Sequence, residues 1–580
     1  MMGSRLGLRE RLDQSRSRLH GDGKESPSRM PPLHGDVNLA LSALTINQEE
    51  ELKAPDHEEN DMEDDESLAM DGEDEEEEDE VDIAPEIQQQ SMKIMHSRYP
   101  NRPPVVCFDY PSDLNVKRSY PDGVVVQDVD MRVSIFFKCY WERNCIKNAF
   151  YRAGLVRIKK GKKWTAAWVK HMSREKFRTL QPHQRVNHFP DPWVIGRKDR
   201  LMKTLVAMKR KFSAAYSFFP EGYLLPTQKD ALLRCLDREV VESLWIVKPP
   251  ASACGRGIKV VSSSQVESWI KKTRPFIVQR YLASPYLING FKFDLRLYVL
   301  VTSFDPLRVY WFQEGLARFC TVKYSTTQLK NRLAHLTNFS VNKKNDSFKA
   351  STTMHDTDGS KWSWTALMAY LAEQNQDVAA LRAKMKAIVV KTIIAAEAHI
   401  APLTQTFVKH RHTCYELFGF DLMVDSALEP WLVEVNVSPS LMGGSPLDKR
   451  IKGLLMSDIF HLVGHPFIAL PVVNGKAAST PSKKPKSFSS RKLAEILHDP
   501  KIQALEPAHV DLFTDDDWDI VHSMDDEADR MGHFERLYPT PDATDYAAFF
   551  ACPRYANRLC EKWMRMTKKA KAKVSQNAAR

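Results

Sequence analysis

The sequence has few cysteines, and none of them belongs to a short paired motif. Its 580 residues include nine cysteines, with no C-x-x-C pair and no regular spacing between them. A cysteine-type zinc site and a disulfide framework both require such spacing. The sequence therefore favours a chain that works in a reducing compartment, without structural zinc or disulfides.

The sequence also lacks an apolar targeting segment and an apolar run that could span a membrane. The opening residues, MMGSRLGLRERLDQS, lack an apolar core, and no apolar run indicates a membrane span. Hydrophobic residues still make up 43% of the chain, which is sufficient for a sizeable core. We expect a soluble, intracellular monomer with about three or four domains and no membrane partner.

The net charge of +9 combines two opposite regions. Residues 49–82 contain 21 acidic residues and one lysine, a charge of −20, so the rest of the chain carries +29. A body this basic indicates an acidic partner, such as nucleic acid, an anionic surface or an acidic protein tail. Because no nucleic-acid-binding module is present, we expect no nucleic acid and favour an acidic protein.

Composition also marks the order of the regions. Residues 1–98 are polar and rich in charge, and we expect them to be disordered, including the acidic run Glu73–Glu80. Residues 103–240 mix short strands and helices. A basic Lys/Ser/Pro linker covers 471–490, and a helical, basic extension follows over 491–580. Thr514 and Asp517 have the spacing of a capping box and predict a helix start in that extension.

The stretch FDLMVDSALEPWLVEVNVS, residues 420–438, predicts two neighbouring strands with a turn between them. Glu434 and Asn436 are two apart, so one strand presents both side chains on the same face. Asp421 can reach that face from the adjacent strand. Oxygen ligands without Cys or His suit magnesium bound to a nucleotide. The alternative is a hairpin whose polar side chains face water.

A glycine-containing loop follows a strand that ends in Lys248. The loop reads ASACGRG, and another strand resumes at 258–261. Lys248 would project onto phosphates, which the backbone amides of Cys254 and Gly255 would approach closely. The segment is not a Walker motif, because no GK[ST] opens a helix. A purely structural hairpin is the alternative interpretation.

Two further strand segments carry polar residues at informative positions. Gln279–Leu282 ends a strand where an adenine could lie against backbone and an amide side chain. In KFDLR, the alternating residues Lys292, Asp294 and Arg296 share one face of an otherwise apolar strand. Such charges are costly unless they face a site or one another, and a surface ladder is the alternative.

These segments carry a family resemblance. The chain resembles the tubulin–tyrosine ligase-like family, and within it the polyglutamylases, in these motifs, in order: NHFPDPWVIGRKDRL, KPPASACGRGIKV, VQRYL, KFDLRLYVLV, FQEGLARF, HLTNFSVNK, ELFGFDLMVD, WLVEVNVSPSL, DDEADRMGHFERLYP and YAAFFACPRY. The resemblance covers about residues 103–560. It implies an α/β (α+β) ATP-grasp ligase fold, with an N-terminal subdomain over 103–240 and the central and C-terminal ATP-grasp subdomains over 241–470.

The resemblance also implies a reaction and site residues. ATP and magnesium would support attachment of free glutamate to glutamate side chains of tubulin tails through an acyl phosphate. The residues matching the family's ATP site are Lys198, Lys248, Cys254, Gly255, Gln279, Arg280, Tyr281, Leu282, Lys292, Phe293, Asp294, Thr337 and Asn338. Those matching the glutamate site are Arg318, Phe339, Ser340 and Lys361. Those matching the magnesium site are Asp421, Glu434 and Asn436.

Catalysis would then be electrostatic. Lys248, Arg296, Arg318 and magnesium would stabilise negative charge, because the substrates supply the nucleophiles themselves. His335 is either a proton handler or a structural histidine, and we favour the structural role. Cys254 and Phe339 depart from the family's usual Arg or Gln and Tyr, which leaves their side-chain roles open.

Three questions stay open at this point. A glycylase on the same fold is the nearest alternative, although its pocket would have no use for a basic residue such as Lys361. A catalytically dead, microtubule-binding relative is another, but Lys248, Asp421 and Glu434 are all present. Neither the choice of α- or β-tubulin nor that of starting or lengthening a glutamate chain is determined. We expect action in the cytoplasm on the cytoskeleton, with the cilium or basal body as a finer location.

Overall fold

The computed structural model describes residues 81–82, 92–100, 102–129, 135–140, 143–252, 255–272, 274–468, 513–541, 543–567 and 570–571 of the 580. All of them belong to one compact unit, residues 69–580. The acidic run Glu73–Glu80, Cys254 and the linker at 471–490 lie outside the described residues. Disorder up to residue 98 was too long a prediction, since β1 (Val81–Asp82) and β2 (Met92–Met95) are strands. The strand β2 is only four residues long, and Met92, Ile94 and Met95 are buried, too short a pattern to recognise.

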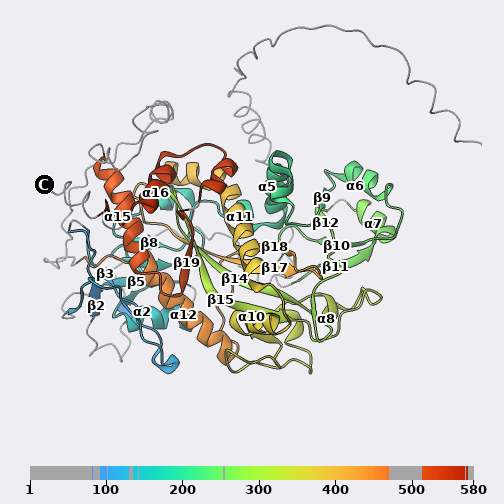
Figure 1. Ribbon diagram of the computed structural model, residues 1–580, viewed down its shortest axis with the longest axis horizontal. Coiled ribbons are helices and arrows are strands. Elements are labelled where there is room, and N and C mark those ends of the chain that lie inside the picture. Colours follow the sequence, from blue (N-terminus) through green and yellow to red (C-terminus); the bar gives the residue numbers. More distant parts are fainter. Residues whose placement is uncertain are drawn as a thin grey trace, which may run out of the picture. The chain divides into compact units, whose positions relative to one another are not determined.

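Two small sheets form the N-terminal part (Figure 1). The first has the order β1-β6-β5-β7-β8 and is parallel from β6 to β8. The second has the order β3-β2-β4 and is antiparallel. The further elements here are β3 (Val105–Val106), β4 (Val126–Val129), β5 (Phe136–Cys139), α2 (Asn144–Arg152), β6 (Val156–Ile158), β7 (Ala166–Trp168), α3 (Arg174–Arg178), β8 (Arg185–Val186), α4 (Trp193–Gly196) and α5 (Lys198–Phe212).

A four-stranded antiparallel sheet carries the predicted phosphate loop. Its order is β11-β10-β12-β9, and its strands and helices are β9 (Gly222–Leu225), α6 (Lys229–Leu236), β10 (Leu244–Lys248), β11 (Lys259–Ser262), α7 (Ser263–Ile270) and β12 (Phe276–Arg280). Trp245, Val247 and Val278 pack with residues of the two helices in a core of its own. Lys248 is the last residue of β10, so the core holds the base of the loop while the loop itself stays outside it.

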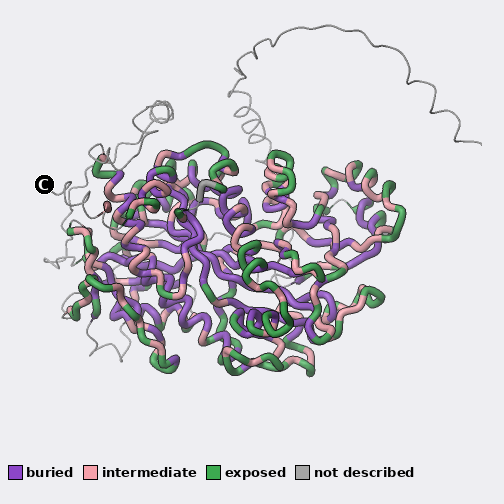
Figure 2. Tube along the Cα trace, viewed as in Figure 1, coloured by how far each residue is buried: buried purple, intermediate pink, exposed green. Residues whose placement is uncertain are grey.

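The large antiparallel sheet is the centre of the molecule. Its main order is β16-β15-β14-β17-β18, with β13 added to β14 and β19 added to β15. The remaining elements are β13 (Leu287–Ile288), β14 (Phe291–Phe304), β15 (Leu307–Phe319), α8 (Arg332–His335), α9 (Phe339–Asn342), β16 (Lys361–Ser363), α10 (Trp364–Glu373), α11 (Val378–Phe407), β17 (Glu416–Val424), β18 (Pro430–Val437), α12 (Pro446–Val463), α15 (Asp515–Asp529), β19 (Phe534–Tyr538) and α16 (Tyr555–Arg565). Figure 2 shows these central strands almost entirely buried.

Alternation along β14 separates the core from the site. Leu295 and Leu297 point to the core cluster that includes residues of α11, whereas Tyr298 and Leu300 point to the cluster that includes α12. The charged positions at 292, 294 and 296 share the second face. One strand therefore supplies two hydrophobic cores and, at one end of one face, a polar site.

The helix α11 is long and apolar enough to cross a membrane by length and composition, which the sequence analysis did not anticipate. Its most apolar window has a mean hydropathy of 1.4 and is 61% buried inside the protein. Ile388, Val389 and Ile393 are among the residues that it packs into the larger core. The helix has the burial of a core helix that supports the central sheet.

The sequence predicted a helical C-terminal extension, but the extension also contains the strand β19. The capping box of Thr514 and Asp517 does begin α15, as predicted. The strand β19 then pairs with β15, with Phe534 opposite Phe312. Five residues of β19 are too few to distinguish from a helix by periodicity alone. The extension therefore completes the central sheet.

Candidate active site

Charged side chains cross the central sheet at one level. Asp294 of β14 lies opposite Arg318 of β15. Two residues along β14, Arg296 lies opposite Asp421 of β17, which in turn lies opposite Glu434 of β18. Directly opposed residues share a face of the sheet, so five residues from four strands meet on one surface. The predicted hairpin and the predicted alternation on β14 are both confirmed.

Four of these residues form a continuous ion network, which runs Arg296–Asp421–Arg318–Asp294. Arg296 donates to both oxygens of Asp421 at 2.6 and 3.1 Å. Arg318 donates to Asp294 at 2.8 and 2.5 Å and to Asp421 at 2.8 Å. Burial alone would raise the pKa of Asp421, but the two guanidiniums outweigh it and hold that pKa well below its usual range. Asp294 and Arg296 of β14 thus pair with opposite charges on the neighbouring strands. The sequence allowed either this arrangement or side chains that face a ligand site.

Two buried lysines lie beside this network without a carboxylate on their amino groups. Lys248 Nζ donates to Gln279 Oε1 at 3.0 Å, and Lys292 Nζ donates to the Tyr281 hydroxyl at 2.9 Å and to the His335 carbonyl at 3.0 Å. Among the described residues, neither lysine has a carboxylate within ion-pair distance. Burial lowers the pKa of both lysines to about 8. A bound phosphate would supply the missing negative charge.

The loop after Lys248 closes on the segment before α9. Gly255 has φ +71°, and a Cβ there would lie 2.8 Å from Asn338 Oδ1. Asn338 precedes α9 as its N-cap, and Thr337 beside it is buried. The side chain of Asn342 donates to the Leu336 carbonyl at 2.7 Å and holds this turn in place. Only glycine fits the close approach at 255.

The predicted magnesium ligands lie next to one another. Asn436 Nδ2 is 3.4 Å from Glu434 Oε1, and Glu434 Oε2 pairs with Lys198 Nζ at 3.1 Å. Lys198 also donates to the Ser252 carbonyl at 2.8 Å, so it links this corner to the phosphate loop. The donor set is two carboxylates and an amide, which suits magnesium. Within the described ranges no cluster of three or more His, Cys, Asp or Glu could hold a metal, so phosphate oxygens and water would have to complete the shell.

The predicted glutamate site lies at the other side of the ion network. Lys361 is the first residue of the strand β16 and lies opposite Arg318. Its Nζ is 2.7 Å from Asp448 Oδ2 and 3.9 Å from the centre of the Phe339 ring. Burial lowers the pKa of Lys361 below its ordinary value, although Asp448 opposes the shift. Ser340 follows Phe339 in the first turn of α9.

The carboxylate that pairs with Lys361 was not predicted from the sequence. Asp448 is fully buried at the start of α12 and also accepts from Lys452 Nζ at 2.8 Å. Ser445 caps that helix, and Pro446 follows it. The segment SPLD therefore has the pattern of an ordinary helix start, in which an acidic residue complements the helix dipole. Only the tertiary structure places this carboxylate between two lysines.

Some residues predicted to line ATP direct their side chains elsewhere. Phe293 packs in the core against Phe319, with ring centres 5.3 Å apart. Arg280 pairs with Glu239 and lies 4.3 Å over the Trp245 ring. Phe293 and Arg280 therefore have only their backbone available for the roles predicted for them. His335 Nδ1 is 2.8 Å from the Tyr281 hydroxyl, a structural contact of the kind we favoured.

Comparison with known proteins agrees with this geometry. The model of the Tubulin-tyrosine ligase family matches residues 176–472, just over half of the chain. The chain belongs to this family. Its fold is accordingly of the ATP-grasp type, and the resemblance noted from the motifs is confirmed.

Relatives with curated names are similar over most of the described residues. The chain is 40% identical over 446 residues to tubulin monoglutamylase TTLL4 of Mus musculus, covering 72% of this chain and 37% of that protein. It is 43% identical over 305 residues to tubulin polyglutamylase TTLL5 of Homo sapiens, covering 52% and 23%. Tubulin polyglutamylase ttll-4 of Caenorhabditis elegans is 34% identical over 414 residues, covering 68% and 66%. The chain thus spans well under half the length of the mouse and human relatives.

Proposed function

We propose that this family member is an ATP-dependent tubulin glutamylase that joins free glutamate to glutamate side chains of tubulin tails. The observation that carries the proposal is the pair of buried lysines, Lys248 and Lys292, beside the carboxylate corner of Glu434. Desolvated cations without a carboxylate partner favour a bound polyanion, and the corner offers oxygen ligands for its metal. Relatives named for tubulin glutamylation are 40% and 43% identical to the chain over the matched residues, which supports the proposal.

The proposed reaction needs an activated carboxylate. The γ-phosphoryl group of ATP passes to a side-chain carboxylate of the tail, which yields ADP and an acyl phosphate. The amine of free glutamate then attacks the acyl carbon and releases phosphate, forming an isopeptide bond. Both steps develop negative charge, which preorganised cations stabilise. Lys248 and Lys292 would hold the phosphates, while Arg296 and Arg318 stabilise the reacting carboxylate.

Glu434, Asn436 and Asp421 would hold magnesium, which would supply positive charge to neutralise the phosphates. Because Asp421 already accepts from two arginines, Glu434 and Asn436 offer the freer donors in this structure. Lys198 contacts both Glu434 and the phosphate loop, so it would orient the metal corner against the phosphates.

Glutamate is favoured over glycine as the incoming amino acid. Arg318 and Lys361 lie opposite each other on adjacent strands and are both buried. Although each already pairs with a protein carboxylate, Arg318 with Asp294 and Lys361 with Asp448, two cations at this position suit an amino acid that brings a second carboxylate. Glycine has no side chain with which to use them, which argues against the glycylase alternative.

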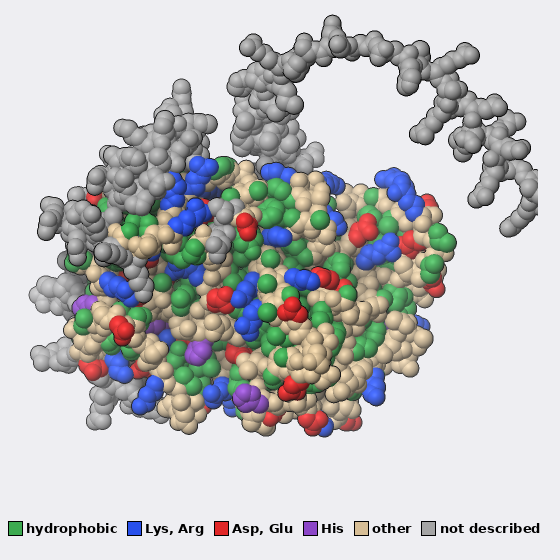
Figure 3. All heavy atoms as spheres, in the orientation of Figure 1, with side chains coloured by type: hydrophobic (Ala, Val, Ile, Leu, Met, Phe, Trp, Pro, Cys, Tyr) green, Lys and Arg blue, Asp and Glu red, His purple; other side chains and the backbone are tan. Residues whose placement is uncertain are grey.

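An acidic protein tail is the substrate that best matches the charge of the chain. The sequence outside residues 49–82 carries +29, and lysine and arginine side chains recur along the upper edge of the face drawn in Figure 3. Tubulin as the partner places the proposed activity on the cytoskeleton, with the cilium or basal body as a narrower site of action. These surfaces would attract the tail before the active site binds it.

The deciding experiment incubates the protein with ATP, magnesium, free glutamate and microtubules, and then weighs the tubulin tails by mass spectrometry. We expect tails heavier by glutamate units, and none when glycine replaces glutamate. A Glu434→Gln protein is the matched inactive control. Masses increased by one unit only would identify an initiating enzyme, and ladders of masses an elongating one. Unmodified tails under all conditions would contradict the proposal and support a non-catalytic binder.

A further inference from the structure

A cavity lies at the opposite end of the central sheet from the candidate active site. Its volume is about 50 Å³, and its lining includes the cations Arg102, Arg185 and Arg530 and the carboxylates Asp526 and Glu527. Thr302 of β14 also lines it, six residues along the strand from Arg296. At about 3.3 Å per residue, this separates the cavity from the ion network by roughly 20 Å. The cavity is therefore a separate feature from the ATP and glutamate sites.

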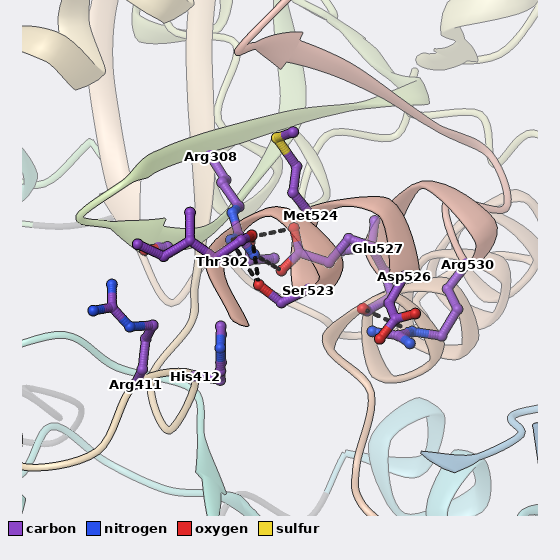
Figure 4. Close-up of polar contacts among 12 residues, drawn as sticks. Thr302, Arg308, Arg411, His412, Ser523, Met524, Asp526, Glu527 and Arg530 are labelled. Atoms are coloured by element: carbon purple, nitrogen blue, oxygen red, sulfur yellow. Dashed lines mark hydrogen bonds and ion pairs between the residues drawn. The ribbon is translucent and has the colours of Figure 1, made fainter. Parts of the chain in front are cut away.

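One wall of the cavity is the helix α15, which is firmly anchored. Figure 4 shows Ser523 and Glu527 of this helix turned toward Arg308 and Thr302 of the central sheet. Glu527 accepts from Arg308 at 3.1 Å and from Thr302 at 3.1 Å. Arg308 is completely buried. The wall thus holds its position without any help from a ligand.

The carboxylates at the cavity already have partners. Asp526 accepts from Arg102 Nε at 2.5 Å, and Asp519 pairs with Arg102 and with His412, the latter at 2.9 Å. Burial lowers the pKa of His412 to about 4, so it is neutral at pH 7. Asp519 and Asp526 therefore both pair with Arg102, and neither carboxylate needs another cation as a partner.

Two other guanidiniums are not compensated in this way. Arg185 donates only to the carbonyls of Pro182 and Gln184, and its Nε is buried without a partner. Arg530, which is 7% exposed, donates only from Nε to the Leu462 carbonyl at 3.3 Å. Among the described residues, no carboxylate lies within ion-pair distance of either one. Asp526 and Glu527 attract Arg530, and Asp519 attracts the half-buried Arg185, only at longer range, so desolvation outweighs them and lowers the pKa of both guanidiniums.

We propose that this cavity binds a small oxyanion, a carboxylate or phosphate group, between Arg185 and Arg530. The planar forks of two arginines suit such a group, since each can donate two parallel hydrogen bonds to it. Arg185 comes from β8 of the N-terminal sheet and Arg530 ends α15, so the anion would tie the extension to the body. The site is independent of the proposed glutamylation.

The test is thermal unfolding of the full chain in the presence of a non-hydrolysable ATP analogue with magnesium, which occupies the other phosphate site. Sodium phosphate, sodium acetate and sodium chloride are titrated separately at equal ionic strength. Ligand that binds only the folded state raises the unfolding temperature in a saturable way. We expect such a rise with phosphate, acetate or both, and none with chloride. The anion that saturates at the lower concentration identifies the preferred group.

Variants assign the effect to the cavity. Arg185→Gln and Arg530→Gln should each raise the half-saturating concentration at least about tenfold, since each removes a charge-assisted contact. Arg411→Gln is the matched control, because Arg411 is exposed and lies near the cavity without lining it (Figure 4). If Arg530→Gln fails to fold, Arg185→Gln decides alone. A rise that is equal in all variants, or equal with chloride, would overturn the proposal.

Discussion

At the scale of single residues, function is indicated by buried cations that have no carboxylate of the protein as a partner. Lys248 and Lys292 are buried with neutral hydrogen-bond partners, whereas Arg296, Arg318, Asp294 and Asp421 satisfy one another. The two lysines are thus free to bind an anionic ligand. The four residues of the ion network hold one another in fixed positions beside it. Predictions for single residues follow from this division.

The pH dependence of ATP binding tests the two lysines. Both have a pKa of about 8 in the free protein because burial disfavours their charge. The phosphates favour the protonated form, so affinity should be greatest below pH 8 and fall as pH rises through that value. Lys248→Arg retains its charge at all these pH values and should flatten the profile. Identical pH profiles of the ATP dissociation constant for both proteins would contradict this role.

Glu434→Gln tests the metal corner. The change keeps the shape of the side chain and removes a charged ligand, so magnesium-dependent turnover should fall about 100-fold or more. Circular dichroism should show an unchanged fold, because Glu434 is only half-buried and its ion pair with Lys198 is partly exposed. Unaltered magnesium-dependent turnover would remove Glu434 from the assignment.

Lys361→Ala tests the predicted glutamate site. Losing a charge-assisted contact typically costs about 1.5–3 kcal/mol, so KM for glutamate should rise about tenfold or more. The KM for ATP should change little, since Lys361 lies beyond Arg318 from the phosphate loop. Asp448→Asn should raise the same KM less, because Lys361 remains, but should also lower stability, because it leaves Lys361 and Lys452 without their carboxylate. Equal changes in both KM values would indicate a folding defect instead.

At the scale of elements, the C-terminal extension is part of the central sheet, because β19 pairs with β15 and α15 is anchored through Glu527. Glu527→Gln leaves Arg308 buried without its charge partner, which typically costs about 3–5 kcal/mol of unfolding free energy. Denaturant titration measures the loss. Glu429→Gln is the control, since its ion pair with Lys384 is about half exposed and should change stability by less than about 1 kcal/mol. Equal losses in the two variants would show that Glu527 is no anchor.

At the scale of the whole molecule, the sequence predicts that the C-terminal extension over 491–580 docks on microtubules, because the lysines and arginines near its end would attract their acidic tails. Truncation at Asn474 would remove β19 and Glu527 as well as surface charge, so it would test folding rather than docking. Charge reversal is the cleaner change. Arg558 and Arg565 are exposed, seven residues apart on α16, and therefore share one side of that helix.

Arg558→Glu combined with Arg565→Glu should weaken co-pelleting with microtubules and flatten its salt dependence, because exposed charges are screened over about 8 Å at physiological salt. Activity on a short tail peptide should persist. Lys271→Glu combined with Lys272→Glu, at the exposed end of α7, reverses the same number of charges elsewhere and is the matched control. Indistinguishable pelleting of the three proteins across a salt series would rule out docking through α16.

The local elements of the site can be recognised from the sequence alone. Alternation placed Lys292, Asp294 and Arg296 on one face, and the hairpin around Asp421 and Glu434 followed from two apolar runs and a turn. Period-two patterns and capping signals are local, so they can be recognised without the fold. The order of motifs was also sufficient to recognise the family.

The tertiary structure decided which charges meet. The pairing of Asp294 with Arg318, the place of Asp448 between two lysines and the sheet contact of β19 each join segments distant in sequence. It also turned the side chains of Phe293 and Arg280 away from the ATP site. Strand register and packing fix these outcomes, and neither is encoded in the spacing of any single segment.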